Sequence, residues 1–323
     1  MEKTKRITRQ ARKRVSCASS STKRASAHGL DLSSKAGTHT HTHTQSQMNR
    51  KQALQFVKNI EEVETLKFLL RECIDRAPEK AMVTNTWQYH ATRFLAWIES
   101  GFDGKPPFKV FMAKGNKKLP FVAFSSLALA DCPGKGACAK WCYSLKAWRY
   151  PAAFFRQVQN SLLLRFNPIV IEESFRSIKH GLQVRLFVDG DFKDVATLER
   201  FMDLCHERPD LSVYGYSKSW KEFVMLNASG YKFPSNYVLN ASSGSKHEGT
   251  GIQNAFMKID VIRGEFVAVP VPEKFIASKA YQDKANPGSK EYRKTVAEKL
   301  KAFSNKVFAC PGSCGNCLPS GRH

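Results

Sequence analysis

The spacing of the hydrophobic residues changes once along the chain, at about residue 105. From Asn49 onward, leucine, valine and isoleucine recur every three or four residues with charged residues between them, which is the pattern of an amphipathic helix. A second helix is predicted from about Thr84 to Ser100, directly before Gly101. The two segments together predict a helical lobe over residues 49–104.

Beyond residue 105, short apolar runs alternate with helical patterns. The predicted strands lie at 184–188, 211–216 and 237–241, and the predicted helices open at Pro151, Pro168 and Asp194. Strands separated by helices of about ten to fifteen residues indicate βαβ units. Residues 105–323 are therefore predicted to form an α/β domain with a mostly parallel sheet. Periodicity does not distinguish an open doubly wound sheet from a partial (β/α) barrel, and we predict the barrel.

Five further predictions rest on shorter signals. They are a β-hairpin over Phe108–Ser125 that turns at Gly115 and Asn116, a capping box of Ser219 and Glu222, a mobile surface loop over Ser242–Gly251, a closing hairpin over Ile259–Val269 that turns at Arg263 and Gly264, and a last helix over Tyr292–Phe303. The loop resembles a phosphate-binding loop only superficially, because the spacing G-x-x-x-x-G-K-[ST] is absent from it.

The first 48 residues lack both patterns and hold much of the charge. Residues 1–50 contain 11 Lys and Arg against 2 acidic residues, which is +9 of the total net charge of +23. Because a segment with almost no large apolar side chains cannot offset the entropy of ordering, we predict a disordered basic leader over residues 1–48. The leader is either an organellar transit peptide or, as we favour, an extension upstream of a natural start at Met48.

The remaining composition describes an ordinary folded protein. A hydrophobic fraction of 42% excludes a fully disordered chain. No run approaches the roughly 18 uninterrupted apolar residues that a membrane span needs. We therefore expect a soluble, cytoplasmic protein without a membrane partner.

Six of the nine cysteines fall in two tight groups. The groups are Cys132, Cys138 and Cys142, with the spacing C-x5-C-x3-C, and Cys310, Cys314 and Cys317, with the spacing C-x3-C-x2-C. Proline and glycine within each group allow a short loop to curl so that several thiolates point at one centre. Disulfides are the alternative, but clustered cysteines in a chain without a secretory signal favour metal ligands.

The number of thiolates leaves the metal open. Six could form one four-cysteine zinc site with two residues spare, a binuclear zinc site, or two iron–sulfur clusters with three protein ligands each. A 4Fe-4S cluster on three cysteines leaves one iron free to bind a substrate or cofactor, whereas a structural zinc site is closed by four ligands. Three cysteines per group therefore favour one or two 4Fe-4S clusters, with zinc as the alternative.

The first group resembles the cluster loop of radical SAM enzymes. In that superfamily three cysteines lie on a loop early in a (β/α) barrel, and an aromatic residue precedes the last of them, as Trp141 precedes Cys142 here, with Tyr143 following. A Gly-Gly-Glu-like strand end there holds the methionine amino group of S-adenosylmethionine. Asp189-Gly190-Asp191 follows a predicted strand in the corresponding position. The resemblance implies a site for S-adenosylmethionine, although the spacing of the first cysteine group departs from the usual C-x3-C-x2-C.

A closer resemblance is to the phage and plasmid gene product 88 family. Its recurring features are a Cys-Pro-Gly loop that ends in Cys-Tyr, a Gly-Asp-Phe strand end, a Tyr-x-Tyr strand that runs into Ser-Trp, and a terminal Cys-rich segment. The matching segments here are Cys132-Pro133-Gly134, Cys142-Tyr143, Gly190-Asp191-Phe192 with the upstream Arg185, Tyr214-Gly215-Tyr216-Ser217-Lys218-Ser219-Trp220, and Cys310–Cys317. This resemblance covers about residues 108–317 and implies no activity by itself.

Two strand ends supply further candidate ligands. Asp189 and Asp191 lie where α/β proteins bind their ligands, and they either bind a metal, ribose or amino group or merely form a turn. Tyr214 and Tyr216 share one strand face, where they either stack on an adenine or pack in the core, and Lys218 could meet a phosphate or carboxylate.

Two functions follow from these residues. The first is a radical-SAM-like iron–sulfur enzyme acting on an unknown substrate, with an auxiliary centre on the second cysteine group. The second is a zinc-stapled module without catalytic activity that binds nucleic acid. Lysine, arginine and aromatic residues between Lys135 and Arg156 surround the first cysteine group, so we expect an anionic small molecule or a nucleic acid as the partner there.

Overall fold

The computed structural model describes residues 48–113, 121–140, 142, 144–266 and 307–308. Several sequence-based predictions lie outside this part of the chain. They are the leader up to residue 47, the last helix over Tyr292–Phe303, the aromatic residues Trp141 and Tyr143, and the ligands Cys310, Cys314 and Cys317. Among the described residues, none of the helices has the length and apolar composition that crossing a bilayer requires.

The first predicted helical stretch is present as two helices. The N-terminal elements are α1 (Arg50–Lys58), α2 (Val63–Asp75), the 3₁₀ turn η1 (Pro78–Lys80) and α3 (Trp87–Glu99). Asn49 and Gln52 form a capping box in which each side chain accepts from the other residue's N–H, at 3.0 and 2.9 Å, and this fixes the start of α1. Thr86 caps α3 by accepting from Tyr89 N at 3.1 Å.

These helices share one hydrophobic core with the α/β part of the chain. Phe56 and Trp87 pack on Phe154 with ring centroids 5.4 and 5.6 Å apart. Phe94 lies 5.7 Å from Phe155, which is fully buried. Edge-on and tilted aromatic packing of this kind contributes beyond simple area burial. The aromatic residues at the start of the helix after Pro151 therefore hold the N-terminal helices against the rest of the chain.

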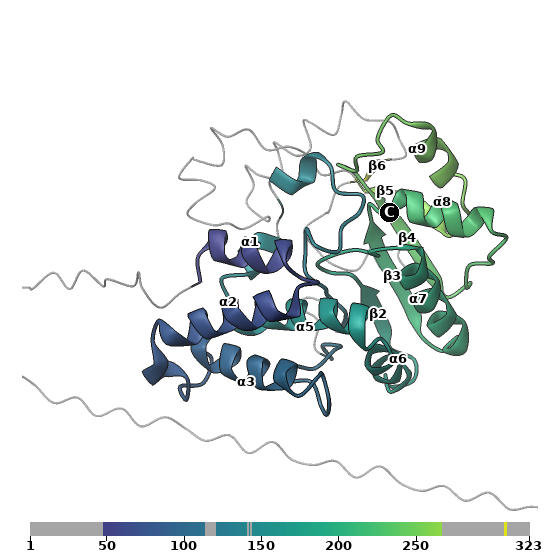
Figure 1. The fold of residues 1–323 in the computed structure, drawn as a ribbon. Helices are drawn as coiled ribbons and strands as arrows, with labels where there is room; N and C mark the ends of the chain where they lie inside the picture. The colour runs from purple at the N-terminus through teal and green to yellow at the C-terminus, as the bar shows by residue number, and fades with distance from the viewer. Residues whose placement is uncertain (1–47, 114–120, 141, 143, 267–306, 309–323) are drawn as a thin grey trace, which may run out of the picture. The chain divides into compact units, whose positions relative to one another are not determined.

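A six-stranded parallel sheet with flanking helices forms the rest of the described chain (Figure 1). Its elements are β1 (Val122–Ala123), the 3₁₀ turn η2 (Ala137–Lys140), α4 (Ser144–Ala147), α5 (Pro151–Phe166), α6 (Ile169–Arg176), β2 (Gln183–Leu186), α7 (Val195–Glu207), β3 (Ser212–Ser217), α8 (Trp220–Ala228), β4 (Tyr237–Ser242), α9 (Gly251–Phe256), β5 (Ile262–Phe266) and β6 (Val307–Phe308). The predicted α/β class and parallel sheet are confirmed.

The strands follow one another in the sheet in chain order, β1 to β6, and each pair is parallel. Because parallel crossovers are right-handed, steps that all advance in one direction place their helices on one face of the sheet. A doubly wound sheet instead reverses its direction at a switch point. The order is thus that of a (β/α) barrel, while closure or curvature of the sheet stays a prediction.

The two faces of the sheet differ in chemistry. Val184 and Leu186 of β2 are fully buried, as are Val213 of β3 and Leu239 of β4. Successive side chains of a strand point to opposite faces. The other face therefore carries Arg185, whose guanidinium carbon lies 4.9 Å from the ring centroid of Tyr216.

One of the two predicted hairpins is wrong, and the other is described only in part. Arg263 and Gly264, predicted as a turn, lie inside β5, which pairs in parallel with β4. A Gly within a short apolar run is typical of a turn. A strand also tolerates Gly where the main chain of a neighbouring strand approaches closely. In the other predicted hairpin, Met112 and Ala123 form one antiparallel bridge, while the turn at Gly115 and Asn116 lies outside the described residues.

The predicted capping box of Ser219 and Glu222 is wrong. Ser219 is the N-cap of α8, but its hydroxyl makes no cap hydrogen bond. It donates instead to the carbonyl oxygen of Phe192, 2.9 Å away, and the Ser219 N–H donates to Ser217 Oγ at 2.9 Å. The Ser219 hydroxyl thus bonds to a residue distant in the sequence instead of capping the helix, as the local sequence predicts.

Candidate metal and cofactor site at the carboxyl edge of the sheet

The segments that follow β1, β2, β3 and β4 meet at the carboxyl edge of the sheet. Parallel strands end at the same edge, and α/β proteins bind their ligands there. Gly190, after β2, has a φ of +77°, and a Cβ added to it would overlap the hydroxyl of Ser126, after β1. Lys218, after β3, donates from Nζ to Oγ of Ser242, the last residue of β4, at 2.6 Å. The connections after β1 and β2 thus touch each other, and the connection after β3 touches the end of β4.

The first cysteine group lies in the connection after β1 and contacts the connection after β4. The N–H of Lys246 donates to the Gly134 carbonyl at 3.0 Å, and the N–H of Gly136 donates to the Gly244 carbonyl at 3.2 Å. Lys135 and Ser245 form an antiparallel bridge. Main-chain hydrogen bonds therefore hold the loop after β1 against the loop after β4.

This contact corrects the prediction for Ser242–Gly251. Ser242, Ser243 and Ser245 are only 8%, 9% and 5% exposed, so the first half of the segment is packed rather than a mobile surface loop. Small residues there let the cysteine loop approach closely, since a Cβ on Gly244 would lie 3.3 Å from the Cβ of Cys138. The run Ser-Ser-Gly-Ser was the available sequence signal, because small side chains often mark a close approach of two main chains.

A buried ion pair anchors the start of the cysteine loop. Asp131, which is fully buried, accepts a hydrogen bond from Arg165 Nη1 at 2.6 Å and another from the hydroxyl of Ser161. Ser161 Oγ in turn accepts from the N–H of Leu127 at 2.7 Å. Both partners lie on α5, so Cys132 follows a residue that is held directly to this helix.

The three thiols of the group are partly buried, and Cys132 lies close enough to Asp191 to feel its charge. Burial raises the pKa of Cys132 well above its usual range, and the nearby carboxyl of Asp191 raises it further, with smaller effects from Asp131 and Cys142. Without a metal this thiol is protonated at neutral pH, and a metal ion would have to displace that proton.

The described residues do not hold three His, Cys, Asp or Glu side chains in a set suited to one metal ion. A single zinc ion needs its sulfur ligands about 2.3 Å away. Thiolates are ligands of both zinc and iron–sulfur clusters, so the donor set of Cys132, Cys138 and Cys142 fits either group.

Asp191 occupies the centre of this edge. It is 4% exposed and accepts three hydrogen bonds, from Phe192 N at 2.9 Å, Ser217 Oγ at 2.7 Å and Lys218 N at 2.7 Å. Burial raises its pKa, and these three hydrogen bonds offset part of that rise. Both carboxylate oxygens are used within the protein, so Asp191 holds the β2 and β3 connections together as a turn residue.

Replacing Asp191 by alanine should lower the free energy of unfolding by about 3 kcal/mol, because three buried donors lose a charged acceptor. Urea denaturation followed by circular dichroism measures this change. Asp260→Ala, at an exposed aspartate, is the control and should stay within about 0.5 kcal/mol of the wild type. Equal effects of the two substitutions would contradict the role assigned to Asp191.

Asp189 lies beside Asp191 in a different environment. It accepts from Ser125 Oγ at 3.2 Å and also from the hydroxyl of Ser144. Burial raises its pKa, while these hydrogen bonds and the charges of Arg185 and Arg156 lower it in part. Asp189 is thus a carboxyl group that faces two arginines next to the cysteine loop.

The raised pKa of Asp189 predicts a pH-dependent effect of Asp189→Asn. The folded protein binds the Asp189 proton more tightly than the unfolded chain does, so this group's contribution to stability is present below its ordinary pKa of 3.8 and is lost as the pH rises through the folded-state value. From pH 4 to pH 7, Asp189→Asn should therefore gain stability relative to the wild type in urea denaturation. A relative loss over that range would mean that the two arginines favour the carboxylate more than burial disfavours it.

Of the other predicted ligands, Lys218 lies at the site and the two tyrosines do not. Lys218 lies at the site, with its Cε within 3.7 Å of where a Cβ on Gly244 would be, next to Cys138. Tyr214 is 2% exposed and packs against Phe121 with centroids 6.4 Å apart, and Tyr216 contacts Phe266 at 5.1 Å. The two tyrosines lie within the sheet, along the strand that leads to the site.

Arg156 also lies at the site, although in the sequence it is only one of several basic residues near the first cysteine group. It projects from α5, and burial lowers its pKa while the charge of Asp189 raises it. Its buried Nε has no hydrogen-bond partner in the part of the chain that the structure describes. Its position on the same helix as the Asp131 anchor could not be recognised from composition alone.

Comparison with known proteins identifies one similarity. A family model described as gene product 88 matches residues 103–317, a range that contains the sheet, the cysteine loop and the Asp189–Asp191 turn. No curated protein and no solved structure matches the chain.

Proposed function

The chain belongs to the gene product 88 family, and we propose that it is an iron–sulfur protein whose first cluster is bound by Cys132, Cys138 and Cys142. One observation carries the proposal. The three-thiol loop follows β1, the Asp189–Asp191 turn follows β2, and both lie at the carboxyl edge of a parallel sheet whose strands run in chain order.

We further propose that the cluster serves a radical-SAM-like enzyme. Radical SAM enzymes carry their three cysteines on an early loop of a (β/α) barrel and their amino-binding strand end soon after it, and the strand order here supports the same arrangement. Such a cluster supplies an electron to S-adenosylmethionine, whose reductive cleavage yields a radical that abstracts hydrogen from a substrate.

The residues of the chain would have separate tasks. Asp191 keeps the turn in place through its three hydrogen bonds, which leaves Asp189 as the carboxyl group able to meet an amino group. The ammonium of Lys218, beside Cys138, offers a positive charge to a carboxylate. Trp141 and Tyr143 flank the last cysteine, as expected of residues beside a nucleoside cofactor. Cys310, Cys314 and Cys317 would bind an auxiliary cluster.

Anaerobic purification followed by metal and sulfide analysis tests the proposal. We expect iron and acid-labile sulfide in equal amounts, and an EPR signal of the reduced protein that changes when S-adenosylmethionine is added. Iron and sulfide with an unchanged signal would retain the cluster and reject the radical chemistry.

Stoichiometric zinc without sulfide would overturn the cluster and favour a zinc-stapled module instead. That module would bind nucleic acid through the basic residues around the loop, and its affinity should then fall steeply as salt is raised. A salt-independent or absent affinity would reject this second function as well.

A further inference from the structure

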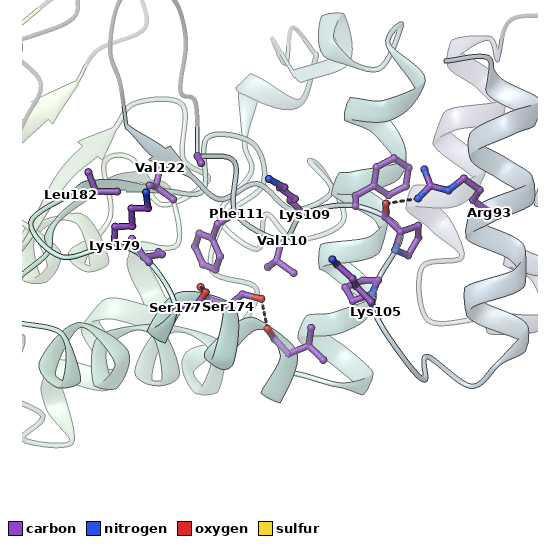
Figure 2. Close-up of a pocket in the computed structure, with 16 residues that line it drawn as sticks. Arg93, Lys105, Lys109, Val110, Phe111, Val122, Ser174, Ser177, Lys179 and Leu182 are labelled. Carbon is purple, nitrogen blue, oxygen red and sulfur yellow. Dashed lines mark hydrogen bonds between the residues drawn. The ribbon is translucent and has the colours of Figure 1, made fainter. Parts of the chain in front are cut away.

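A groove separate from the cysteine site opens between α3, α6 and the segment Phe108–Ala113 (Figure 2). Its volume is about 760 Å³, which is within the range of ligand-binding pockets. Figure 2 shows Arg93 at one end of the groove and Lys179 with Leu182 at the other. None of the described residues that line it belongs to the site at the carboxyl edge of the sheet.

The charged residues on the rim of the groove are cations. Arg93, Lys105, Lys109 and Lys179 line it and are exposed, and among the described residues no Asp or Glu lines it. In the part of the chain that the structure describes, the three lysine side chains make neither a hydrogen bond nor an ion pair, whereas Arg93 donates to the carbonyl of Pro107 at 3.1 Å. Such a rim is complementary to a ligand with several negative charges.

The cation at the end of the neighbouring helix α6 is neutralised instead. Arg176, at the end of α6, donates to Glu207 at 2.7 Å and lies 3.4 Å from Glu172. Glu172 also pairs with Arg200 of α7. The α6–α7 surface therefore balances its charges internally, and the lysines around the groove do not.

The floor of the groove is apolar, and main-chain groups beside it make no hydrogen bond within the described chain. Val110 and Val122 are each 4% exposed, and Ile178 is 9% exposed. The N–H and C=O groups of Lys109 and Phe111, which also line the groove, have no hydrogen-bond partner within the described chain. Main-chain groups of this kind give affinity when a peptide pairs with them, while apolar pockets select alternate side chains.

We propose that this groove binds an acidic peptide segment of a partner protein. The carboxylates of the peptide would meet Lys105, Lys109 and Lys179, its apolar side chains would lie on the floor, and its main chain would pair with the free groups of Lys109 and Phe111. A single-stranded nucleic acid fits less well, because it needs exposed rings on which to stack its bases. The two phenylalanines that line the groove, Phe108 and Phe111, are each only 8% exposed.

Fluorescence polarisation with the full-length chain tests this proposal. The probe is a labelled peptide of about 12 residues with the repeat Glu-Leu-Ser, long enough to follow the groove. The triple variant Lys105→Glu, Lys109→Glu, Lys179→Glu should weaken binding at least about 30-fold, because three attractions become repulsions. Ser177→Trp, which fills the groove from an exposed lining position, should weaken it about 10-fold without altering any charge.

The matched control is the triple variant Lys51→Glu, Lys232→Glu, Lys258→Glu, which has the same net charge but changes exposed lysines outside the groove. It should weaken binding less than about 3-fold. Equal losses in the two triple variants, or no saturable binding of the peptide to the wild type, would overturn the proposal. So would tighter binding of a thymidine oligonucleotide of about 12 nucleotides that is lost in the first triple variant, since the groove would then be a nucleic-acid site. Thermal denaturation confirms that each variant is folded.

Discussion

Replacing Cys132, Cys138 and Cys142 together by alanine should abolish the EPR response to S-adenosylmethionine and remove about half of the bound iron and acid-labile sulfide. This is the largest functional effect that we expect. The three thiols are the only cysteines that the described structure brings to the carboxyl edge of the sheet. Without them, no thiolate remains next to the Asp189–Asp191 turn in the described part of the chain.

The remaining iron would belong to the auxiliary cluster proposed on Cys310, Cys314 and Cys317. Changing that second group to alanine should therefore lower the iron content by a similar amount but preserve the response to S-adenosylmethionine. Complete loss of iron from either triple variant would instead mean that the six cysteines share one centre.

The control is the double variant Cys73→Ala, Cys205→Ala. Both thiols are buried in helices, where burial raises the pKa of Cys73 to about 11 and that of Cys205 still further. Thiols that stay protonated inside apolar surroundings do not bind metal. The double variant should thus retain all of its iron, and a loss comparable to that of the first triple variant would contradict the assignment of the ligands.

Among the glycines that the structure describes, Gly134 should tolerate replacement by alanine least. A Cβ at this position would overlap the main-chain carbonyl oxygen and carbon of Lys218. Neither atom can rotate away, since both belong to the backbone at the end of β3. The cysteine loop would have to move, which breaks its hydrogen bond from Lys246 and displaces Cys132 from Asp191.

We expect Gly134→Ala to lower the free energy of unfolding by about 3 kcal/mol and the iron content at least about fivefold. Gly136→Ala should have a smaller effect in the same direction, because its Cβ would approach Lys246 N to 2.7 Å and the Gly244 carbonyl oxygen to 2.8 Å. Gly251→Ala is the control, with nothing within 4 Å of the added methyl group, and should be neutral. Urea denaturation and iron analysis of the three variants measure the order, and an effect of Gly251→Ala equal to that of Gly134→Ala would contradict it.

Sequence predictions succeed where the residues that determine an element lie close together in the chain. The capping box at Asn49 and the cap at Asp194, whose side chain accepts from Thr197 N at 2.7 Å, act within three residues, and the helices begin where the pattern predicts. The prediction for Ser219 failed although it used the same kind of signal. Its hydroxyl has a better partner in Phe192, 27 residues away, which no local pattern contains.

The predicted site likewise combines features that are local in the sequence with contacts between distant segments. The cysteine loop and the aspartate turn were recognisable as candidate ligands from residue type and spacing. Their meeting depends on the Gly134–Lys218 contact and on the pairing of the cysteine loop with the loop after β4. These contacts join segments more than 80 residues apart in the chain, so a sequence pattern could predict neither the contacts nor the site residue Arg156.

The amino-acid sequence by itself determined most of the helices, the strands β2 to β4, the α/β class and the candidate ligands, because propensity, periodicity and side-chain chemistry act over a few residues. The tertiary structure alone decided the sequential strand order, the packing of the Ser242–Gly251 segment, the hydrogen-bond partners of Asp189 and Asp191, and the cationic groove beside α6. These features depend on which surfaces meet when the chain collapses, and that outcome is set by contacts between distant segments.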